Sequence, residues 1–175
     1  MPLIVAGDGI PQGRVTDTVA NLVDVYPFII ECVGEDRPGM IEPDHPGVSI
    51  VRLANGENPE RTVLCEYHGM GSTTGAFAIR HGPFKYIHYV KYRPQLFDLE
   101  RDPDEAQDLS ADRRHADILL ECEMKLRALL SPEEVDARAK KRQAEQLERQ
   151  GGREAVVARG DLGFSPPPGI PAKFE

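Results

Sequence analysis

Hydrophobic and polar positions alternate in several short runs between residues 61 and 99, which is typical of β-strands. Gly82 and Pro83 interrupt the pattern after His81 and favour a tight turn between two of these runs. In the run after the turn, both faces carry aromatic or aliphatic side chains, so we expect both to be partly covered. The pattern predicts a small antiparallel sheet of about four strands, at residues 61–67, 76–79, 84–91 and 96–99.

After residue 112 the hydrophobic period lengthens to that of an α-helix. Asp112 can cap a helix from about Arg113 to Leu130. We expect this helix to pack on the sheet through an apolar stripe made of Ile118, Leu119, Cys122, Leu126 and Leu129. Residues 131–134, Ser-Pro-Glu-Glu, form a capping box with Pro at the first helical position. They predict a second, charge-rich helix to about Gln150, and residues 153–159 predict a short further turn.

The first 58 residues predict a different kind of structure. Residues 3–6, Leu-Ile-Val-Ala, are apolar on both faces, which favours a buried strand of a parallel sheet. Asp24 can cap a helix to about Cys32, with Gly34 ending it. A Pro- and Gly-rich surface loop follows at 35–47, and a short helix at 49–55. The whole chain therefore predicts an α+β fold, a small antiparallel sheet packed by a long C-terminal helix and preceded by a strand and helix of an incomplete α/β core.

The net charge and the hydropathy of the sequence argue against nucleic acid and membranes as partners. The net charge is −8 and the isoelectric point is near 5.2, whereas nucleic acid and anionic membranes are normally met by basic surfaces. No run approaches the roughly 18 apolar residues that span a bilayer, and no export signal is recognisable. We therefore expect no nucleic acid and no membrane as partner, and a cytoplasmic location unless an export signal was lost from a longer chain.

Few residues offer chemistry. The three cysteines, Cys32, Cys65 and Cys122, form no metal-binding pattern and predict reduced, mostly buried thiols. The carboxylates of Asp102, Asp104, Glu105 and Asp108 lack the spacing of a calcium loop, so we interpret them as turn and cap residues. No dinucleotide, P-loop or zinc-protease motif occurs. The sequence therefore predicts no catalytic residue and no metal ligand in this chain.

One loop is a candidate for substrate binding. His68 lies in a Gly-rich loop at 68–75 together with Ser72 and Thr73. An imidazole and hydroxyls on such a loop could bind an anionic or hydroxylated substrate, and the alternative is a solvent-facing loop histidine. The pattern favours structural roles for His81, His88 and His115, in a turn, on a strand face and at a helix start.

Residues 76–109 carry a resemblance to a known family. The turn, Phe-Lys-Tyr-Ile at 84–87 and the stretch Gln-Leu-Phe-Asp-Leu-Glu at 95–100, with its acidic continuation to Leu109, resemble the C-terminal subdomain of sulfatases, in the alkaline phosphatase superfamily. Residues 2–15 and 22–27 are similar to a late strand and helix of the family, although Phe28 stands where it usually has Thr. Residues 150–156 and 163–169 are similar to the tail of choline-sulfatase-like bacterial members.

The resemblance implies three parts. Residues 1–58 would be a remnant of the α/β sulfatase core, residues 59–130 the C-terminal antiparallel sheet with its helix, and residues 131–175 a charged helix and an extended tail. Sulfatases use a Cys or Ser within C-x-P-S/A-x-R, converted to formylglycine, as nucleophile, and acidic residues hold a divalent cation, usually calcium. Neither Cys32 nor Cys65 has this context, and the resemblance places the metal ligands outside this sequence.

The resemblance therefore predicts the C-terminal portion of a sulfatase-like hydrolase, inactive by itself, whose loop at 68–75 forms a wall of a pocket for a sulfate ester. Its expected partner is an N-terminal sulfatase half, or a second copy bound through the tail, where Phe164, Ile170 and Phe174 could anchor. Two alternatives stay open, a non-catalytic binding or assembly module derived from a sulfatase and a truncated reading frame.

Overall fold

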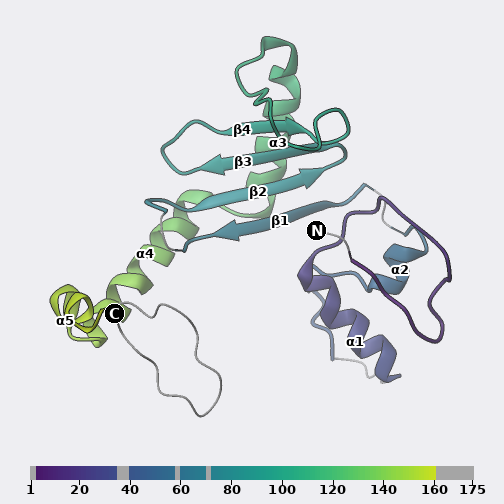
Figure 1. Cartoon of the computed structure of the whole chain (residues 1–175), viewed down its shortest axis with the longest axis horizontal. Helices are drawn as coiled ribbons and strands as arrows, with labels where there is room; N and C mark the ends of the chain where they lie inside the picture. The colour runs from purple at the N-terminus through teal and green to yellow at the C-terminus, as the bar shows by residue number, and fades with distance from the viewer. Residues whose placement is uncertain (1–2, 35–39, 58–59, 70–71, 161–175) are drawn as a thin grey trace.

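The computed structural model describes residues 3–34, 40–57, 60–69 and 72–160, and it consists of one four-stranded sheet with helices around it (Figure 1). The strands are β1 (Thr62–Tyr67), β2 (Ala76–His81), β3 (Phe84–Tyr89) and β4 (Gln95–Asp98). The helices are α1 (Val25–Val33), α2 (Ile50–Ala54), α3 (Ala116–Leu129), α4 (Pro132–Arg149) and α5 (Gly152–Arg159), and 3-10 turns η1 (Leu22–Asp24) and η2 (Arg113–His115) precede α1 and α3.

The sheet is an antiparallel meander in the order β1-β2-β3-β4. Ile79 pairs with Leu64 on one side and with Tyr86 on the other, and Tyr86 pairs with Leu96. This register places a continuous apolar row across one face of the sheet. The predicted α+β fold with an antiparallel sheet is therefore confirmed.

Helix α3 covers that apolar face and contacts β2 and β3. The buried core consists of Phe77, Ile79, Tyr86, Val90, Leu96, Cys122 and Leu126. The predicted stripe is confirmed for Cys122 and Leu126, which are 2% and 0% exposed. It is wrong for Leu129, the last residue of α3, which is 51% exposed, because the next residue, Leu130, packs against the core instead.

Helix α4 begins as the capping box predicts. Ser131 is its N-cap, Pro132 its first residue, and the Ser131 hydroxyl accepts a hydrogen bond from the Glu134 amide at 3.4 Å. Such a cap satisfies one of the amides that a helix start leaves without an intrahelical partner. Helix α5 follows after a short break, and the tail with its expected anchors at 164, 170 and 174 lies outside the described residues.

The N-terminal module, residues 3–57, contains α1 and α2 and lies below β1 in Figure 1. Gly34 ends α1 in the left-handed conformation, as the sequence predicts. The predicted short helix at 49–55 is present as α2, and the Ser49 hydroxyl caps it by accepting from the Val51 amide. The buried strand at residues 3–6 is wrong for this structure, because Leu3 and Ile4 are 54% and 88% exposed. A strand that is apolar on both faces needs neighbours on both sides, and no described strand pairs with this run.

A buried ion pair joins this module to the start of β1. The Asp24 side chain is fully buried and accepts two hydrogen bonds from the Arg61 guanidinium, at 2.8 and 2.9 Å. It also accepts from the amides of Asn21 and Val48, at 2.6 and 2.9 Å. The sequence predicts Asp24 as the cap of α1, but its carboxylate makes no capping bond to that helix and binds these groups instead.

The thiols only partly follow the prediction. All three cysteines are free, and Cys122 is buried, but Cys32 and Cys65 are exposed. The expectation of mostly buried thiols is wrong for these two, because Cys32 lies in the last turn of α1 and Cys65 is on the face of β1 opposite Leu64, which packs against the core. No helix in the described part of the chain is long and apolar enough to cross a membrane.

Candidate functional site

The loop between β1 and β2 contains the predicted site, and His68 is its most constrained side chain. The imidazole packs edge-on against Phe77, with ring centroids 5.3 Å apart, and its Nε2 lies 3.2 Å from a Glu66 carboxylate oxygen. Its Nδ1 is buried and has no hydrogen-bond partner among the described residues. His68 is therefore not the fully solvent-facing loop histidine of the alternative interpretation, since its side chain is only 22% exposed.

The neighbouring hydroxyls differ in their roles. Ser72 is exposed, and its hydroxyl donates to the Thr74 carbonyl. Thr74 is buried and donates to the Val90 carbonyl at 3.0 Å, which ties the end of the loop to the end of β3. Thr73 is exposed. His68 and Ser72 line one small recess, whereas Thr73 is not among its lining residues.

Helix α4 holds this loop from the other side. Asp136 is 5% exposed. It accepts a hydrogen bond from the Gly75 amide at 2.7 Å and forms an ion pair with Lys140 at 2.8 Å. Gln143, two turns further along α4, donates to the His68 carbonyl at 2.7 Å. Burial opposes ionisation of Asp136, but the hydrogen bonds from Lys140 and Gly75 outweigh it and hold its pKa below the ordinary value.

The recess between the loop and α4 is about 20 Å³ in volume, which is room for about one water molecule. It is lined by His68, Ser72, Thr74, Gly75, Asp136, Ala139, Lys140 and Gln143. Sequence reasoning missed the three polar residues of α4, because their spacing of four and three residues in a charged helix is typical of any solvated face. The recess by itself is too small for an organic sulfate ester.

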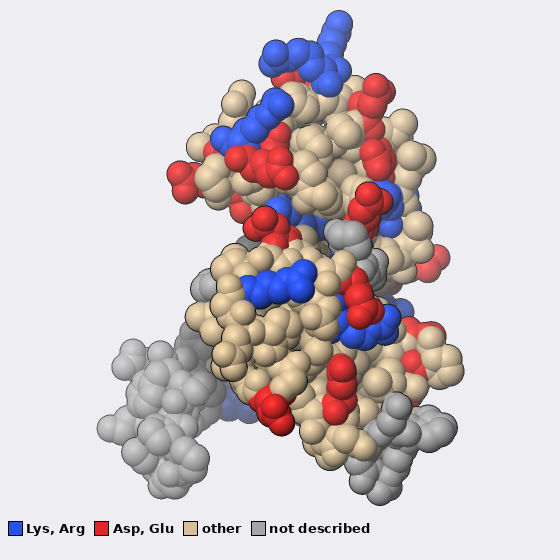
Figure 2. Space-filling model, turned by 90° about the vertical axis from the view of Figure 1, so that its right-hand side faces the viewer, with Lys and Arg blue, Asp and Glu red and all other residues tan. Residues whose placement is uncertain are grey.

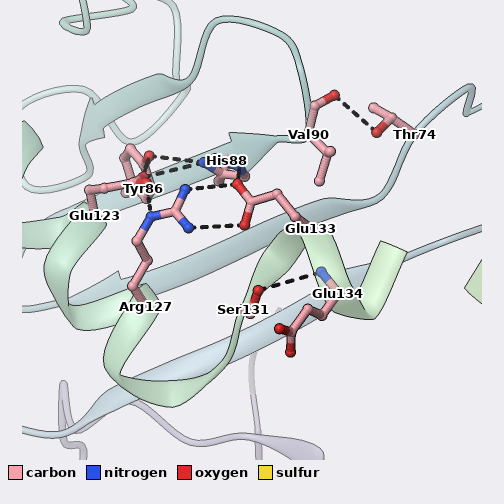
Figure 3. Close-up of polar contacts among 9 residues, drawn as sticks. All are labelled: Thr74, Tyr86, His88, Val90, Glu123, Arg127, Ser131, Glu133 and Glu134. Atoms are coloured by element: carbon pink, nitrogen blue, oxygen red, sulfur yellow. Dashed lines mark hydrogen bonds and ion pairs between the residues drawn. The ribbon is translucent and has the colours of Figure 1, made fainter. Parts of the chain in front are cut away.

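A second polar cluster joins the sheet to the junction of α3 and α4 (Figure 3). Arg127 lies between two carboxylates, donating to Glu123 at 2.5 Å and twice to Glu133 at 2.9 Å. Tyr86 donates to Glu123 from the sheet, and His88 Nδ1 lies 3.3 Å from the same carboxylate. His88 Nε2 is 3.8 Å from Glu133. These contacts support the structural role predicted for His88.

The cluster shifts the titration of its members. Burial and the hydrogen bond to Glu123 raise the pKa of Tyr86 well above its ordinary range. Burial opposes ionisation of Glu123, but hydrogen bonds from Tyr86 and Arg127 lower its pKa. The double hydrogen bond from Arg127 lowers the pKa of Glu133 to about 2. The charged forms of Glu123 and Glu133 and the neutral form of Tyr86 are therefore favoured, as suits a structural network of one hydroxyl donor and two carboxylate acceptors.

The acidic turn after β4 has structural duties. Carboxylate oxygens of Asp98, Asp102 and Asp108 each accept hydrogen bonds from two backbone amides, and Glu105 binds Lys85 at 2.6 Å. The interpretation as turn and cap residues is confirmed for Asp102 and Asp108, whereas the Glu105 carboxylate pairs with Lys85. Within residues 3–34, 40–57, 60–69 and 72–160, no three His, Cys, Asp or Glu side chains converge to hold a metal ion. The described residues therefore do not fit the calcium of the sulfatase family.

His81 and His115 also make local contacts. The His81 imidazole and the Thr62 hydroxyl, on the paired strands β2 and β1, form a hydrogen bond of 3.1 Å. The imidazole also lies 3.6 Å from the Glu121 carboxylate. His115 lies 3.3 Å from Asp112, whose side chain caps the turn that begins the helix. These three contacts support the structural roles predicted for the two residues.

Comparison with known proteins defines the class as a sulfatase C-terminal region. The family model described as "N-sulphoglucosamine sulphohydrolase, C-terminal" matches residues 1–131. The chain belongs to this family. The match includes the N-terminal module, the sheet and α3, and it ends where α4 begins.

Relatives support the same assignment. Arylsulfatase K of Mus musculus is 30% identical over 149 residues, which cover 78% of this chain and 26% of the relative. Choline-sulfatase of Rhizobium meliloti (strain 1021) is 37% identical over 114 residues, which cover 65% of this chain and 22% of the relative. The chain thus spans about a quarter of the length of these relatives.

Solved structures show a similar fold. The structure of a 2-O GAG sulfatase matches with a TM-score of 0.58 and 26% identity, and covers 77% of this chain and 29% of the other. A structure whose title names a complex with D-glucosamine-2-N,6-O-disulfate matches with a TM-score of 0.53 at 20% identity, which shows the fold alone. The suspected relationship to the C-terminal part of sulfatases is therefore confirmed.

Proposed function

We propose that this chain supplies the C-terminal part of a sulfuric ester hydrolase and acts with an N-terminal part that carries the nucleophile and the calcium ligands. The match of a C-terminal sulfatase model to residues 1–131 carries this proposal. The chain contains no C-x-P-S/A-x-R sequence, and it covers only 26% of a relative such as arylsulfatase K of Mus musculus. The chemistry of sulfate transfer would therefore be supplied by the N-terminal part.

In this proposal the loop at 68–75 forms one wall of the pocket. Sulfate oxygens accept hydrogen bonds, and His68 and Thr73 offer an imidazole and an exposed hydroxyl as donors, while the exposed Ser72 hydroxyl would donate to a sulfate only by leaving the Thr74 carbonyl. The buried Nδ1 of His68, which has no partner among the described residues, is the contact that a sulfate ester would satisfy. The recess beside it holds about one water, so the rest of the pocket would come from the N-terminal part.

A turnover assay tests the proposal that this chain needs an N-terminal part for catalysis. The purified chain is incubated with 4-nitrophenyl sulfate and added calcium, and release of 4-nitrophenol is followed. We expect no turnover above that of buffer, because the nucleophile and the metal ligands are not on this chain. Activity that persists in repeated, independent preparations would overturn the claim that the chain needs a second part.

Substitution of His68 tests the pocket wall. His68→Ala should weaken binding of a sulfate ester to the assembled enzyme at least tenfold, because it removes the buried imidazole. His115→Ala is the matched control, since His115 is 24% exposed and also contacts a carboxylate, at 3.3 Å. Unchanged binding in His68→Ala, with an unchanged unfolding midpoint, would remove the wall role and leave the family assignment intact.

The alternative function is a non-catalytic binding or assembly module. The missing nucleophile sequence favours it, and a homo-oligomer formed through residues 161–175 would fit it. Co-purification discriminates the two proposals, because only the first requires a polypeptide with C-x-P-S/A-x-R bound to this chain. A cytoplasmic location stays a prediction in both.

A further inference from the structure

Glu66 and His68 form a carboxylate–imidazole pair at the end of β1. Residues two apart along an extended chain lie on the same face, and a Glu66 carboxylate oxygen is 3.2 Å from His68 Nε2. Their side chains are 35% and 22% exposed, so the contact is partly shielded from water. Phe77, which pairs with Glu66 across the sheet, packs against the imidazole at an interplanar angle of 78°. The ring is therefore held in place by a carboxylate and by a buried aromatic side chain.

The contact with Glu66 decides which nitrogen of His68 carries the proton. An ionised carboxylate only accepts hydrogen bonds, so Nε2 is the donor. In the neutral imidazole, a proton on Nε2 leaves a lone pair on Nδ1, and only the imidazolium donates from both nitrogens. Nδ1 is buried and has no hydrogen-bond partner among the described residues. Neutral His68 therefore presents a lone pair, and not an N–H group, to a molecule that binds beside Nδ1.

The Nδ1 edge of the imidazole borders the recess between the loop and α4. Gly75 lines this recess, and a Cβ built on Gly75 would lie 3.0 Å from His68 Nδ1. The Gly75 amide already donates to Asp136 at 2.7 Å, so it is not free for a ligand. The recess has room for about one water molecule, which is also room for one oxygen of a sulfate group. The hydrogen bond that such an oxygen would accept from the imidazole must come from Nδ1.

The charged groups that face the imidazole come from β1 and α4. Glu66 lies on β1, Asp136 and Lys140 line the recess from α4, and the contact from β2 is the uncharged Phe77. Burial opposes ionisation of Asp136, but its hydrogen bonds outweigh this effect and keep its pKa below the ordinary value. With His68 neutral, two carboxylates outweigh one ammonium group. With His68 as an imidazolium, the charges around the recess balance.

The overall charge of the chain opposes binding of an anion. The net charge is −8, and acidic and basic side chains are interspersed on the face that Figure 2 shows. An anion that binds to an acidic protein needs positive charge at the binding site itself. An imidazolium at position 68 beside the Lys140 ammonium group provides it, and a neutral imidazole does not.

We propose that Glu66 is a positioning residue that makes His68 bind a sulfate ester only as an imidazolium. This inference rests on the proposed function, in which a sulfate meets Nδ1 of His68. Glu66 keeps Nε2 protonated, so Nδ1 becomes a donor only when the ring gains a second proton. A sulfate monoester keeps its negative charge in neutral and mildly acidic solution, so the pH dependence comes from the protein. Binding should weaken as the pH rises through the range of about 5 to 8, in which histidine side chains lose their charge.

NMR spectroscopy of the full chain tests the position of the proton without a ligand. Two-bond proton–nitrogen correlation spectra of the isotopically labelled chain distinguish the two neutral forms of an imidazole. At a pH at which His68 is neutral, we expect the wild type to carry the proton on Nε2. In Glu66→Gln, the new amide group can donate to Nε2, which lets the proton move to Nδ1. A neutral wild-type ring with its proton on Nδ1 would overturn the inference.

The pH profile of binding tests the role of Glu66 in the assembled enzyme. The nucleophile of the N-terminal part is replaced by Ala so that 4-nitrophenyl sulfate binds without reacting, and its Kd is measured by calorimetry. Between about pH 5.5 and 8, the wild-type Kd should rise at least about tenfold, because one charge-assisted hydrogen bond is lost. In Glu66→Gln the rise should be less than about threefold, because its neutral ring can still donate from Nδ1.

Asp112→Asn is the matched control, because Asp112 also lies beside a histidine, 3.3 Å from His115, and Asn keeps the capping ability of the side chain. It should show the wild-type profile. If the ester binds and Glu66→Gln, with an unchanged unfolding midpoint, keeps the wild-type slope, the role of Glu66 is wrong and the proposed function stands. The same holds if wild-type binding does not change with pH. If the assembled enzyme binds no ester at any pH, the pocket-wall role of the loop fails, and this inference fails with it.

Discussion

The carboxylate of Asp24 and the guanidinium of Arg61 are the most deeply buried pair of opposite charges in the described part of the chain, with 0% and 8% of their side chains exposed. Asp24 accepts four hydrogen bonds, so its charge is compensated without water. Removing one partner from such a pair leaves the other charge buried and unpaired, which costs more than the pair itself contributes. This pair, together with the hydrogen bond from Asn21 to the Leu64 carbonyl, therefore holds the N-terminal module on β1.

Arg61→Ala should lower the free energy of unfolding by about 3–5 kcal/mol, because Asp24 then stays buried without a cation. Arg52→Ala is the control, since Arg52 pairs with Glu57 at 2.7 Å on an exposed surface, with side chains 60% and 48% exposed. Such a pair contributes about 0–1 kcal/mol. Urea unfolding measures both variants, and equal losses in the two would contradict the role assigned to the buried pair.

Gly75 is the position at which the candidate loop meets the core. A Cβ built there would lie 2.9 Å from both His68 Cε1 and Phe77 Cε2, closer than side-chain carbons approach one another. Phe77 is fully buried and cannot move aside without disturbing the sheet. The close packing of these three residues is therefore possible only with glycine.

Gly75→Ala should destabilise the protein by about 1–3 kcal/mol through overpacking. Adding Phe77→Leu should recover part of this loss relative to the sum of the single variants, because it frees space beside the new methyl group. Denaturant unfolding of the two single variants and the double variant completes the cycle. Strict additivity would show that the methyl group is accommodated by movement of His68 and not of Phe77.

Among the elements, α4 has the least apolar sequence and depends on polar contacts. Val135 packs against the core cluster, but the helix is otherwise held by Asp136 to the Gly75 amide, by Gln143 to the His68 carbonyl and by Glu133 to Arg127. Helices of this composition are marginal when isolated. The junction of α3 and α4 should therefore respond to pH through its carboxylates.

Stability should fall as the pH drops from about 4.5 to about 2, which are the ordinary and the folded-state pKa of Glu133. A pKa that is lower in the folded state stabilises above the ordinary value and loses this contribution as the carboxylate is protonated. Glu133→Gln should reduce stability near pH 7 and weaken its pH dependence in that window. Glu134→Gln is the control, because Glu134 extends away from Arg127 (Figure 3). Thermal unfolding midpoints across this range measure the effect, and identical profiles for wild type and Glu133→Gln would contradict it.

At the scale of the whole molecule, exposed apolar surface is concentrated toward the N-terminal module. Large apolar residues that are exposed there include Leu3, Ile4, Val15, Leu22, Val23, Tyr26, Ile29, Val33, Met40 and Ile41. The sheet and α3, by contrast, enclose a core of their own. The sheet and α3 therefore bury most of their large apolar side chains within the described structure, whereas the N-terminal module leaves many of its own exposed.

Calcium should not stabilise the isolated chain. A ligand raises the unfolding midpoint only if the folded state binds it, and no metal-binding group of three side chains occurs in residues 3–34, 40–57, 60–69 and 72–160. Differential scanning calorimetry with and without millimolar calcium should give equal midpoints, with magnesium as the ionic control. A calcium-specific rise would place a ligand set on this chain and overturn its assignment as the part without the metal.

Local signals determined much of the fold. Alternation and the turn at Gly82 and Pro83 were sufficient for the hairpin of β2 and β3, and Ser131 with Pro132 was sufficient for the start of α4, because each depends on neighbours in the chain. The same local logic assigned the acidic turn and also carried the family resemblance. The run at residues 3–6 failed because a buried strand depends on partners that local sequence does not specify.

Only the tertiary structure decided which polar groups meet across the chain. Asp24 and Arg61 are 37 residues apart, Gly75 and Asp136 are 61 apart, and His68 and Gln143 are 75 apart. No pattern in a single sequence pairs them, because each contact is set by how α4 and the N-terminal module pack on the sheet. The sequence by itself determined where the candidate loop lies and to which family the chain belongs. The packing of α4 determined what holds that loop, and the packing of α1 on α2 determined which face of α1 stays exposed.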